Sequence, residues 1–327
     1  MQWPLGPNPT PRELLLIYND GFPGAPVNPI ERDSLFADGL VKTADHIQHL
    51  VLQNPGNGKR ALLFRSREQF DPGAFGKENQ TDGDCTSHGD RNTRDTARCV
   101  EIHVKGEPER YKGRGATEPT YGFRGHSGAG MDPGRAARFV TEYGFMIRQN
   151  YSGCVDLSQY NSSVGSRWGR SGPPSCVLEQ CKEHPVGEYV TPNDPDEAMA
   201  LFHNGYPCHS GQNIGFDSTP NSRGYHDRQG SWNHDMATVG YDDTCKIWPV
   251  RVYFVVNSWG KWNSQWSKWE NDSELQRILG PPITGMMTVH HEVWERYFLG
   301  GQSIYFYSDI KGYPMQKLPD YGTGTFL

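Results

Sequence analysis

The sequence lacks long apolar runs and an excess of positive charge. No stretch of 18 or more apolar residues occurs in its 327 residues, the mean hydropathy is -0.73, and the formal net charge is -6. A membrane-spanning helix needs such a run, and a protein that grips a phosphate backbone usually carries a basic patch. We therefore expect neither a membrane nor a nucleic acid as a partner.

A secretion signal and an even set of cysteines are also missing. The first residues, Met1 to Pro7, do not show the basic and then apolar order of a signal peptide. The seven cysteines are an odd number, so at least one thiol stays outside any intramolecular disulfide. Without a secretion signal, most of the thiols are expected to be reduced. We expect the protein to remain inside a cell, or inside something assembled there, such as a virion.

Two segments carry the start and stop signals of helices. Residues 133–143 follow Asp132, a good N-cap, begin with a proline at the first helical position, and end before Gly144. Residues 195–203 follow Asp194, and Glu197 lies where its carboxylate can reach back to the free amides of the first turn. The sequence therefore predicts a helix over each segment.

The pattern changes to strands in the last third of the chain. Short runs rich in β-branched and aromatic residues, bounded by Gly, Pro, Asp or Asn, cover residues 236–241, 250–256, 286–289 and 303–307. Helices that precede strands in this way indicate an α+β fold, whose two lobes can enclose a cleft. Residues 1–64, which begin Pro-rich, are expected to form an N-terminal extension that packs on the main body.

Three polar residues in this frame suit a thiol nucleophile. Cys85 stands near the expected start of a helix, His234 leads a strand, and Asn257 ends the next strand. A helix N-terminus and a nearby imidazolium both stabilise a thiolate. A side-chain carbonyl such as that of Asn257 fixes the imidazole tautomer by accepting from its other nitrogen. Trp259 is expected to shield that hydrogen bond from water.

The motifs around these residues resemble those of the papain-like cysteine peptidases. The resemblance is close at Asn257-Ser258-Trp259-Gly260 and at Asn233-His234, and it is looser at Gly83-Asp84-Cys85-Thr86, which is similar to a bacterial Gly-Ser-Cys-Thr variant. It covers roughly residues 65–300 and implies a papain-like α+β domain over 65–327. That domain would have a helical lobe at about 65–200, an antiparallel β lobe at about 201–300, and a C-terminal strand and tail at 301–327.

The resemblance also implies the roles of neighbouring residues. Gly128, Ala129 and Gly130 match a glycine-rich segment that lines the substrate cleft, where small residues let a peptide backbone approach. The family places a glutamine oxyanion donor six residues before the cysteine. Here Asn79 holds that position and Gln80 lies one residue too close, so either amide is a candidate.

Two features leave alternatives open. A rival register aligns Cys85 with an earlier, non-catalytic cysteine of the family and puts His88 in the position of the nucleophile, which would make the enzyme inactive.

Residues 89–98 are highly polar where the family has a mostly apolar central helix. If this segment is helical, Asp90 with Arg94 and Arg91 with Asp95 have the i,i+4 spacing of ion pairs. These charges pair locally or meet another subunit.

We therefore carry two functions forward. The first is a cysteine endopeptidase or related acyl-transfer enzyme with a Cys85, His234 and Asn257 triad, acting on a peptide or protein. The second is a catalytically silent papain-fold structural or binding component of a larger assembly such as a phage particle, in contact with its other subunits. We expect no cofactor and no metal, since Cys176 and Cys181 have no complementary ligand pair at zinc-like spacing.

Overall fold

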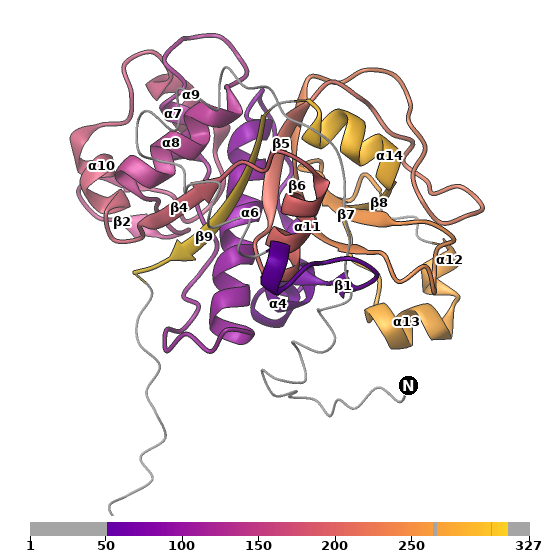
Figure 1. Cartoon of the computed structure of the whole chain (residues 1–327). Helices are drawn as coiled ribbons and strands as arrows, with labels where there is room; N and C mark the ends of the chain where they lie inside the picture. Colours follow the sequence, from indigo (N-terminus) through magenta and orange to yellow (C-terminus); the bar gives the residue numbers. More distant parts are fainter. Residues whose placement is uncertain (1–50, 264–266, 302, 313–327) are drawn as a thin grey trace, which may run out of the picture.

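Helices and a seven-stranded antiparallel sheet build the molecule, as the sequence predicts. The computed structural model describes residues 51–263, 267–301 and 303–312. Figure 1 shows α6 (Cys85–His103) in the middle of the fold, with the smaller helices of one lobe on one side and the sheet on the other. The helices besides α6 are α4 (Leu63–Phe70), α5 (Ala74–Lys77), α7 (Glu118–Gly122), α8 (Pro133–Tyr143), α9 (Ser162–Trp168), α10 (Ser175–Cys181), α11 (Pro195–His203), α12 (Ser267–Glu270), α13 (Ser273–Leu279), α14 (His291–Trp294) and the π-helix η1 (Glu295–Leu299).

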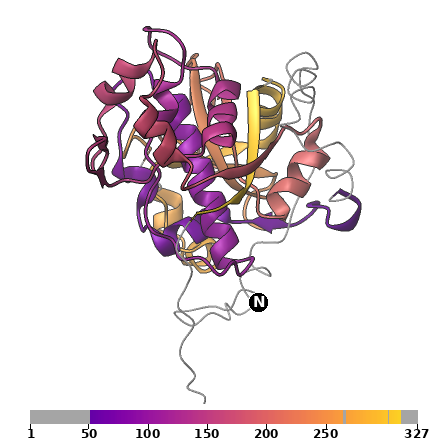
Figure 2. The same ribbon diagram turned by 90° about the vertical axis from the view of Figure 1, so that its left-hand side faces the viewer.

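The sheet joins the two lobes through its last described strand. Its strand order is β4-β9-β5-β6-β7-β8, with β1 added on β6. Figure 2, turned so that the helical lobe faces the viewer, shows β9 in yellow beside α6. The strands are β1 (Arg60–Ala61), β4 (Val186–Val190), β5 (Cys208–Gln212), β6 (His234–Asp242), β7 (Val252–Val256), β8 (Met286–His290) and β9 (Ser303–Ile310), and β2 (Asn150–Tyr151) with β3 (Val155–Asp156) forms a separate hairpin.

Both helices that the sequence signals predict are present with the predicted bounds. The side chain of Asp132 accepts from the Arg135 amide at the start of α8, and Gly144 ends that helix with a positive φ of 83°. The side chain of Asp194 accepts from the Glu197 amide at the start of α11. The strands also lie where they were expected, although β6, β8 and β9 run longer and β7 starts at Val252. Local capping signals were therefore sufficient to locate these helices.

The start of the described chain belongs to the sheet as well as to the predicted extension. Residues 1–50 of the extension, and the tail from residue 313, lie outside the described residues. Within residues 51–64, β1 pairs with the end of β6, and the predicted boundary at residue 64 falls inside α4. Gly240 makes that pairing possible, because a Cβ there would lie 2.2 Å from the Ala61 carbonyl oxygen. This edge strand places Leu62 and Phe64 in the core of the β lobe.

Helix α6 is buried along nearly its whole length despite its polar sequence. All residues from 86 to 102 are buried. Arg94 donates to Asp90 at 2.9 Å, as the i,i+4 spacing predicts, whereas Asp95 accepts from Arg67 at 2.9 Å and Arg91 pairs with Glu78. The prediction of an Arg91–Asp95 pair was therefore wrong, because partners outside the helix reach both side chains. Buried charges are tolerated when each has such a partner.

Candidate active site

Cys85 is the first residue of α6 and lies partly exposed at its N-terminus. The first amides of a helix have no partner within it, and its dipole favours negative charge. Burial raises the pKa of Cys85 to about 11, the Asp235 carboxylate adds to that rise, and the backbone amides of Asp235 and Thr86 oppose it by bonding the sulfur. Taken by itself, the thiol is therefore protonated at neutral pH.

His234 and Asn257 are brought together by two neighbouring strands. His234 opens β6 and Asn257 directly follows β7, and the two strands pair with Ala237 opposite Val256. His234 Nε2 lies 2.8 Å from Asn257 Oδ1. An amide oxygen only accepts, so Nε2 carries the proton and Nδ1 is left for a second partner. This is the tautomer that a base directed at a thiol needs.

Three tryptophans cover this hydrogen bond. The rings of His234 and Trp259 have centroids 4.7 Å apart, and Trp232 lies at the same distance from Trp259. Trp262 packs on both tryptophans. The cover leaves Asn257 buried, with 1% of its surface exposed. A dry environment strengthens the His234–Asn257 bond. Trp259 therefore contacts the His234 ring, and shielding of the hydrogen bond stays its predicted role. Trp232 was not predicted, although it stands only two residues before His234.

Cys85 and His234 line one cavity of about 550 Å³. Gly130 belongs to its helical wall, and Gly211 at the end of β5 belongs to its sheet wall. Arg296 of η1 and Ser303 of β9 also line it. The cavity thus lies where the two lobes meet, with the thiol and the imidazole both facing the same space.

The other predicted cleft residues differ in how close they lie to this cavity. Gly128 and Ala129 are exposed on the loop before α8, and only Gly130 of the three lines the cavity. The amide of Gly130 donates to the Gly83 carbonyl at 2.9 Å, which ties the loop to the segment before Cys85. The glycine-rich loop is therefore fixed beside the thiol at its last residue.

The two candidate oxyanion donors, Gln80 and Asn79, make different contacts. The amide of Gln80 donates to the Ser258 carbonyl at 2.8 Å, and its side-chain Nε2 donates to the Asp82 carbonyl at 2.9 Å. Ser258 also donates its hydroxyl to Gln80 Oε1. Asn79 instead forms an isolated antiparallel β-bridge with Trp259, and it lines a different cavity. Gln80 is therefore anchored directly next to Asn257.

His88, the nucleophile position of the rival register, is fully buried behind the site. Its ring packs edge-on against Tyr160 with centroids 5.0 Å apart, and its Nε2 lies 3.5 Å from Asp84. It does not line the cavity that holds Cys85 and His234. Burial lowers the pKa of His88, and its charge would lower that of His234 in turn.

Two buried histidines of the β lobe, His234 and His226, differ in their surroundings although burial lowers the pKa of each to about 4. His226 Nδ1 accepts from the Thr288 amide at 3.2 Å, and His226 does not line the cavity. Each is neutral in the folded state at pH 7, so its contribution to stability is present above the unfolded pKa of about 6.5. That contribution is lost as pH falls from there toward 4.

We expect His226→Gln to reduce the acid sensitivity of the fold. Between about pH 6.5 and 4 the unfolded state binds a proton at this position and the folded state does not. The unfolding free energy of wild type therefore falls by about 3 kcal/mol over that range. Urea unfolding at a series of pH values measures the slope. An unchanged slope in the variant would show that His226 does not stay neutral when buried.

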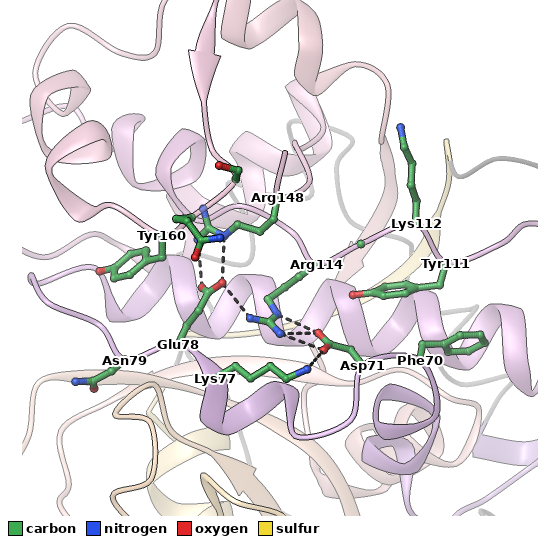
Figure 3. A pocket seen from close by; sticks show the side chains of 13 residues that line it. Phe70, Asp71, Lys77, Glu78, Asn79, Tyr111, Lys112, Arg114, Arg148 and Tyr160 are labelled. Carbon is green, nitrogen blue, oxygen red and sulfur yellow. Dashed lines mark hydrogen bonds and ion pairs between the residues drawn. The ribbon is translucent and has the colours of Figure 1, made fainter. Parts of the chain in front are cut away.

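A second cavity, of about 770 Å³, lies away from the thiol and is walled by ion pairs (Figure 3). Arg114 bonds both Asp71 at 2.8 Å and Glu78 at 3.1 Å, and Arg148 bonds Glu78 at 3.1 Å. Burial alone would raise the pKa of Glu78, but Arg91 and Arg148 hold it well below its usual range. Among the described residues that line this cavity there is no cysteine and no histidine. The ion pairs of this cavity hold Asp71 and Glu78, in the segment before α6, against Arg114 and Arg148.

The remaining cysteines divide into one disulfide and several thiols. Cys154 and Cys176 form a disulfide within the helical lobe. Cys176 therefore has no free thiol to act as a ligand together with Cys181. Cys99, Cys181 and Cys208 are buried free thiols, and Cys245 is an exposed one. In the described residues, no three His, Cys, Asp or Glu side chains are grouped as a metal site, and no helix is long and apolar enough to cross a membrane.

Comparison with known proteins identifies the fold. No protein-family model and no curated protein matches the sequence. Among solved structures, xylellain, a cysteine protease from Xylella fastidiosa, is similar with a TM-score of 0.52 at 14% identity, over 90% of this chain and 98% of that one. Procathepsin B S9 from Trypanosoma congolense is similar with a TM-score of 0.46 at 11% identity, over 92% of this chain and 89% of that one. Amb a 11, a ragweed pollen cysteine protease in its proform, has a TM-score of 0.43 at 12% identity, over 97% and 75%. The chain has the papain-like α+β fold, as its motifs implied.

Proposed function

We propose that the chain is a papain-like cysteine peptidase, or a related acyl-transfer enzyme, acting on a peptide or protein. Cys85 is the nucleophile, His234 is its base, and Asn257 holds the base in the required tautomer. The observation that carries this proposal is that Cys85 and His234 face one cavity while His234 Nε2 bonds Asn257 Oδ1 at 2.8 Å. His88 does not line that cavity, which favours Cys85 over the rival register.

The reactive form arises by proton transfer inside the cavity. Burial leaves the thiol of Cys85 and the imidazole of His234 both neutral when each is considered alone. Moving the proton from Cys85 Sγ to His234 Nδ1 creates a thiolate and an imidazolium in one cavity without changing its net charge. Their attraction is strong where water is excluded. The amides of Asp235 and Thr86 and the dipole of α6 add to the stability of the thiolate.

The thiolate then attacks the substrate carbonyl carbon. A bond forms between Cys85 Sγ and that carbon, and the carbonyl oxygen takes the negative charge. The proposed donors to that oxygen are the backbone amide of Cys85 and the side chain of Gln80, whose Nε2 then exchanges the Asp82 carbonyl for the oxyanion. Asn79 is less well placed because it lines the other cavity. His234 returns its proton to the leaving amine, and water or another acceptor later releases the acyl group from Cys85.

We expect a thiol-reactive epoxide to label the full-length protein once, at Cys85. Labelling should reach one equivalent in wild type and should disappear in Cys85→Ala, because only a thiol held as a thiolate opens the epoxide rapidly. Mass spectrometry of the intact chain and of its peptides measures the stoichiometry and the site.

Cys245→Ala is the matched control, since Cys245 is also a free and accessible cysteine but lies outside the cavity. That variant should label like wild type. A folded wild-type chain that remains unlabelled at Cys85 would contradict the proposal.

One observation favours the silent papain-fold component as a second candidate. Burial raises the pKa of Cys85 to about 11, and the Asp235 carboxylate beside it acts in the same direction. If the attraction of His234 does not overcome these effects, the thiol stays protonated and the chain serves as a structural or binding subunit. The same labelling experiment separates the two candidates, because an inert Cys85 in folded protein favours the second.

A further inference from the structure

Asp235, the residue after His234, faces the nucleophile's helix from within the sheet. Its side chain is buried, with 2% of the residue exposed, and its carboxylate reaches so far toward α6 that a Cβ on Gly89 would lie 2.0 Å from Oδ1. Its backbone amide bonds the Cys85 sulfur, while its carboxylate disfavours the thiolate. A lone carboxylate at this position would therefore oppose the chemistry proposed for Cys85.

A chain of buried hydrogen bonds leads from Asp235 through β5 and β9 back to α6. His209 Nδ1 lies 2.9 Å from Asp235 Oδ2, and His209 Nε2 lies 2.9 Å from the Tyr307 hydroxyl. Tyr307 donates to Asp90 Oδ1 at 3.0 Å, and Asp90 accepts from Arg94 at 2.9 Å. His209 and Asp90 are fully buried. The chain thus connects β6, β5, β9 and α6.

The donors and acceptors of this chain leave one arrangement of protons. Asp90 faces Arg94 and accepts, so the single hydroxyl proton of Tyr307 points to Asp90. The Tyr307 oxygen then has to accept, which requires a proton on His209 Nε2. The second nitrogen of His209 faces Asp235, and one further proton lies between them. His209 and Asp235 therefore share a proton, and the pair carries no net charge.

The electrostatics of the pair agree with this arrangement. Burial raises the pKa of Asp235 to about 6, and the charge of His209 only partly offsets that rise. Burial alone would lower the pKa of His209, but Asp235 raises it above its usual value. Both directions mean that the pair keeps its shared proton. Other titratable or charged groups act on the pair or on Cys85. They are Asp84, Asp90 and Arg94 at or on α6, Asp132 before α8, Cys208 on β5 and Tyr307 on β9.

We propose that His209 is a positioning residue for the nucleophile, because it neutralises the Asp235 carboxylate beside Cys85 and is itself held by Tyr307 and Asp90. This inference rests on the proposed function, in which Cys85 reacts as a thiolate. His209 keeps the Asp235 side chain turned toward β5 and leaves the Asp235 amide directed at the sulfur. Tyr307 keeps the second ring proton of His209 in place.

Two substitutions in the pair should move the reactivity of Cys85 in opposite directions. His209→Gln removes the compensating charge and leaves the Asp235 carboxylate alone beside Cys85, where its ionised form repels the thiolate. We expect the apparent pKa for alkylation of Cys85 to rise by about one unit. In wild type His209 offsets the effect of the Asp235 carboxylate on Cys85 only in part. Asp235→Asn removes the remaining repulsion, and we expect that pKa to fall by about one unit. A merely structural role predicts no shift, or two shifts of the same sign.

The double variant His209→Gln with Asp235→Asn tests the coupling directly. Without the carboxylate His209 has nothing to neutralise, so the double variant should have the alkylation pKa of Asp235→Asn alone. The measurement is the rate of iodoacetamide alkylation of Cys85 from about pH 4 to 9, followed by peptide mass mapping of the full chain. A Cys245→Ala background removes the other exposed thiol.

Controls and a milder variant keep the test decisive. Asp242→Asn removes another buried carboxylate of β6, and Tyr151→Phe removes a buried hydroxyl bonded to Ile147, so neither should shift the alkylation pKa. If His209→Gln does not fold, Tyr307→Phe carries the test with a smaller upward shift. If Cys85 is labelled in wild type but its alkylation pKa does not shift in Tyr307→Phe or in the pair variants, this inference alone is overturned. Unlabelled wild type overturns the proposed function and this inference with it.

Discussion

Replacing His234 by alanine is expected to reduce peptide hydrolysis by at least about 10⁴-fold. Without the imidazole, the thiol of Cys85 keeps the pKa of about 11 that burial gives it. At pH 7 only about one molecule in 10⁴ then carries a thiolate, by the definition of a pKa. The leaving amine also loses its proton donor, so the loss in kcat should exceed this factor. Steady-state turnover of a peptide library at pH 7 measures the effect.

His226→Gln provides a matched control for this prediction. His226 is another buried histidine of the β lobe with an equally low pKa, but it bonds the backbone of Thr288 instead of Asn257. Turnover should therefore stay within about threefold of wild type, as is usual for a substitution outside the reacting groups. Activity retained in His234→Ala would mean that another base serves Cys85, and His88, whose charge acts on His234, would be the first to test.

Replacing Asp95 by alanine is expected to lower the free energy of unfolding by about 3 kcal/mol, because it removes the fully buried carboxylate that pairs with Arg67 and leaves that guanidinium only Asp71, at 3.3 Å, as an ionic partner. Asp95 is fully buried in α6 and accepts from Arg67 at 2.9 Å and from the Gly115 amide at 3.0 Å. Arg67 is fully buried too, so its charge cannot turn to water after the substitution. Chemical denaturation followed by tryptophan fluorescence measures the loss.

An exposed ion pair of the same chemistry is the control. Arg277 and Glu274 bond each other on α13, with 38% and 61% of their side chains exposed. Water solvates either partner when the other is removed, so Glu274→Ala should change the unfolding free energy far less than Asp95→Ala does. An Asp95→Ala variant as stable as Glu274→Ala would show that the polar face of α6 does not depend on its partners.

Signals confined to a few neighbouring residues allowed much of this fold to be predicted. The bounds of α8 and α11 follow from Asp132, Asp194 and Gly144, because a cap acts within one helical turn. The meeting of His234 with Asn257 was foreseeable too, since one residue opens a strand and the other ends the next. Both predictions depend on short stretches of chain.

What the sequence could not reveal depends on partners far along the chain. The burial of α6 requires Arg67 and Glu78 from segments before the helix, and nothing near Asp95 or Arg91 indicates which of them each will meet. The contact of His209 with Asp235 depends on the register between β5 and β6, which pairs His209 with Ala237 and Gly211 with Asp235. A one-residue slip would turn either side chain to the other face of the sheet.

The position of β9 has a consequence for the order in which a newly made chain becomes reactive. Residues 303–310 are the last described strand, yet they lie inside the sheet between β4 and β5. Before they are made, β4 has no neighbour in the described sheet and His209 lacks Tyr307. Cys85 and His234 are synthesised much earlier, but their cavity also lacks Ser303 until then. The chain is therefore expected to stay harmless to its own translation machinery until synthesis has passed β9.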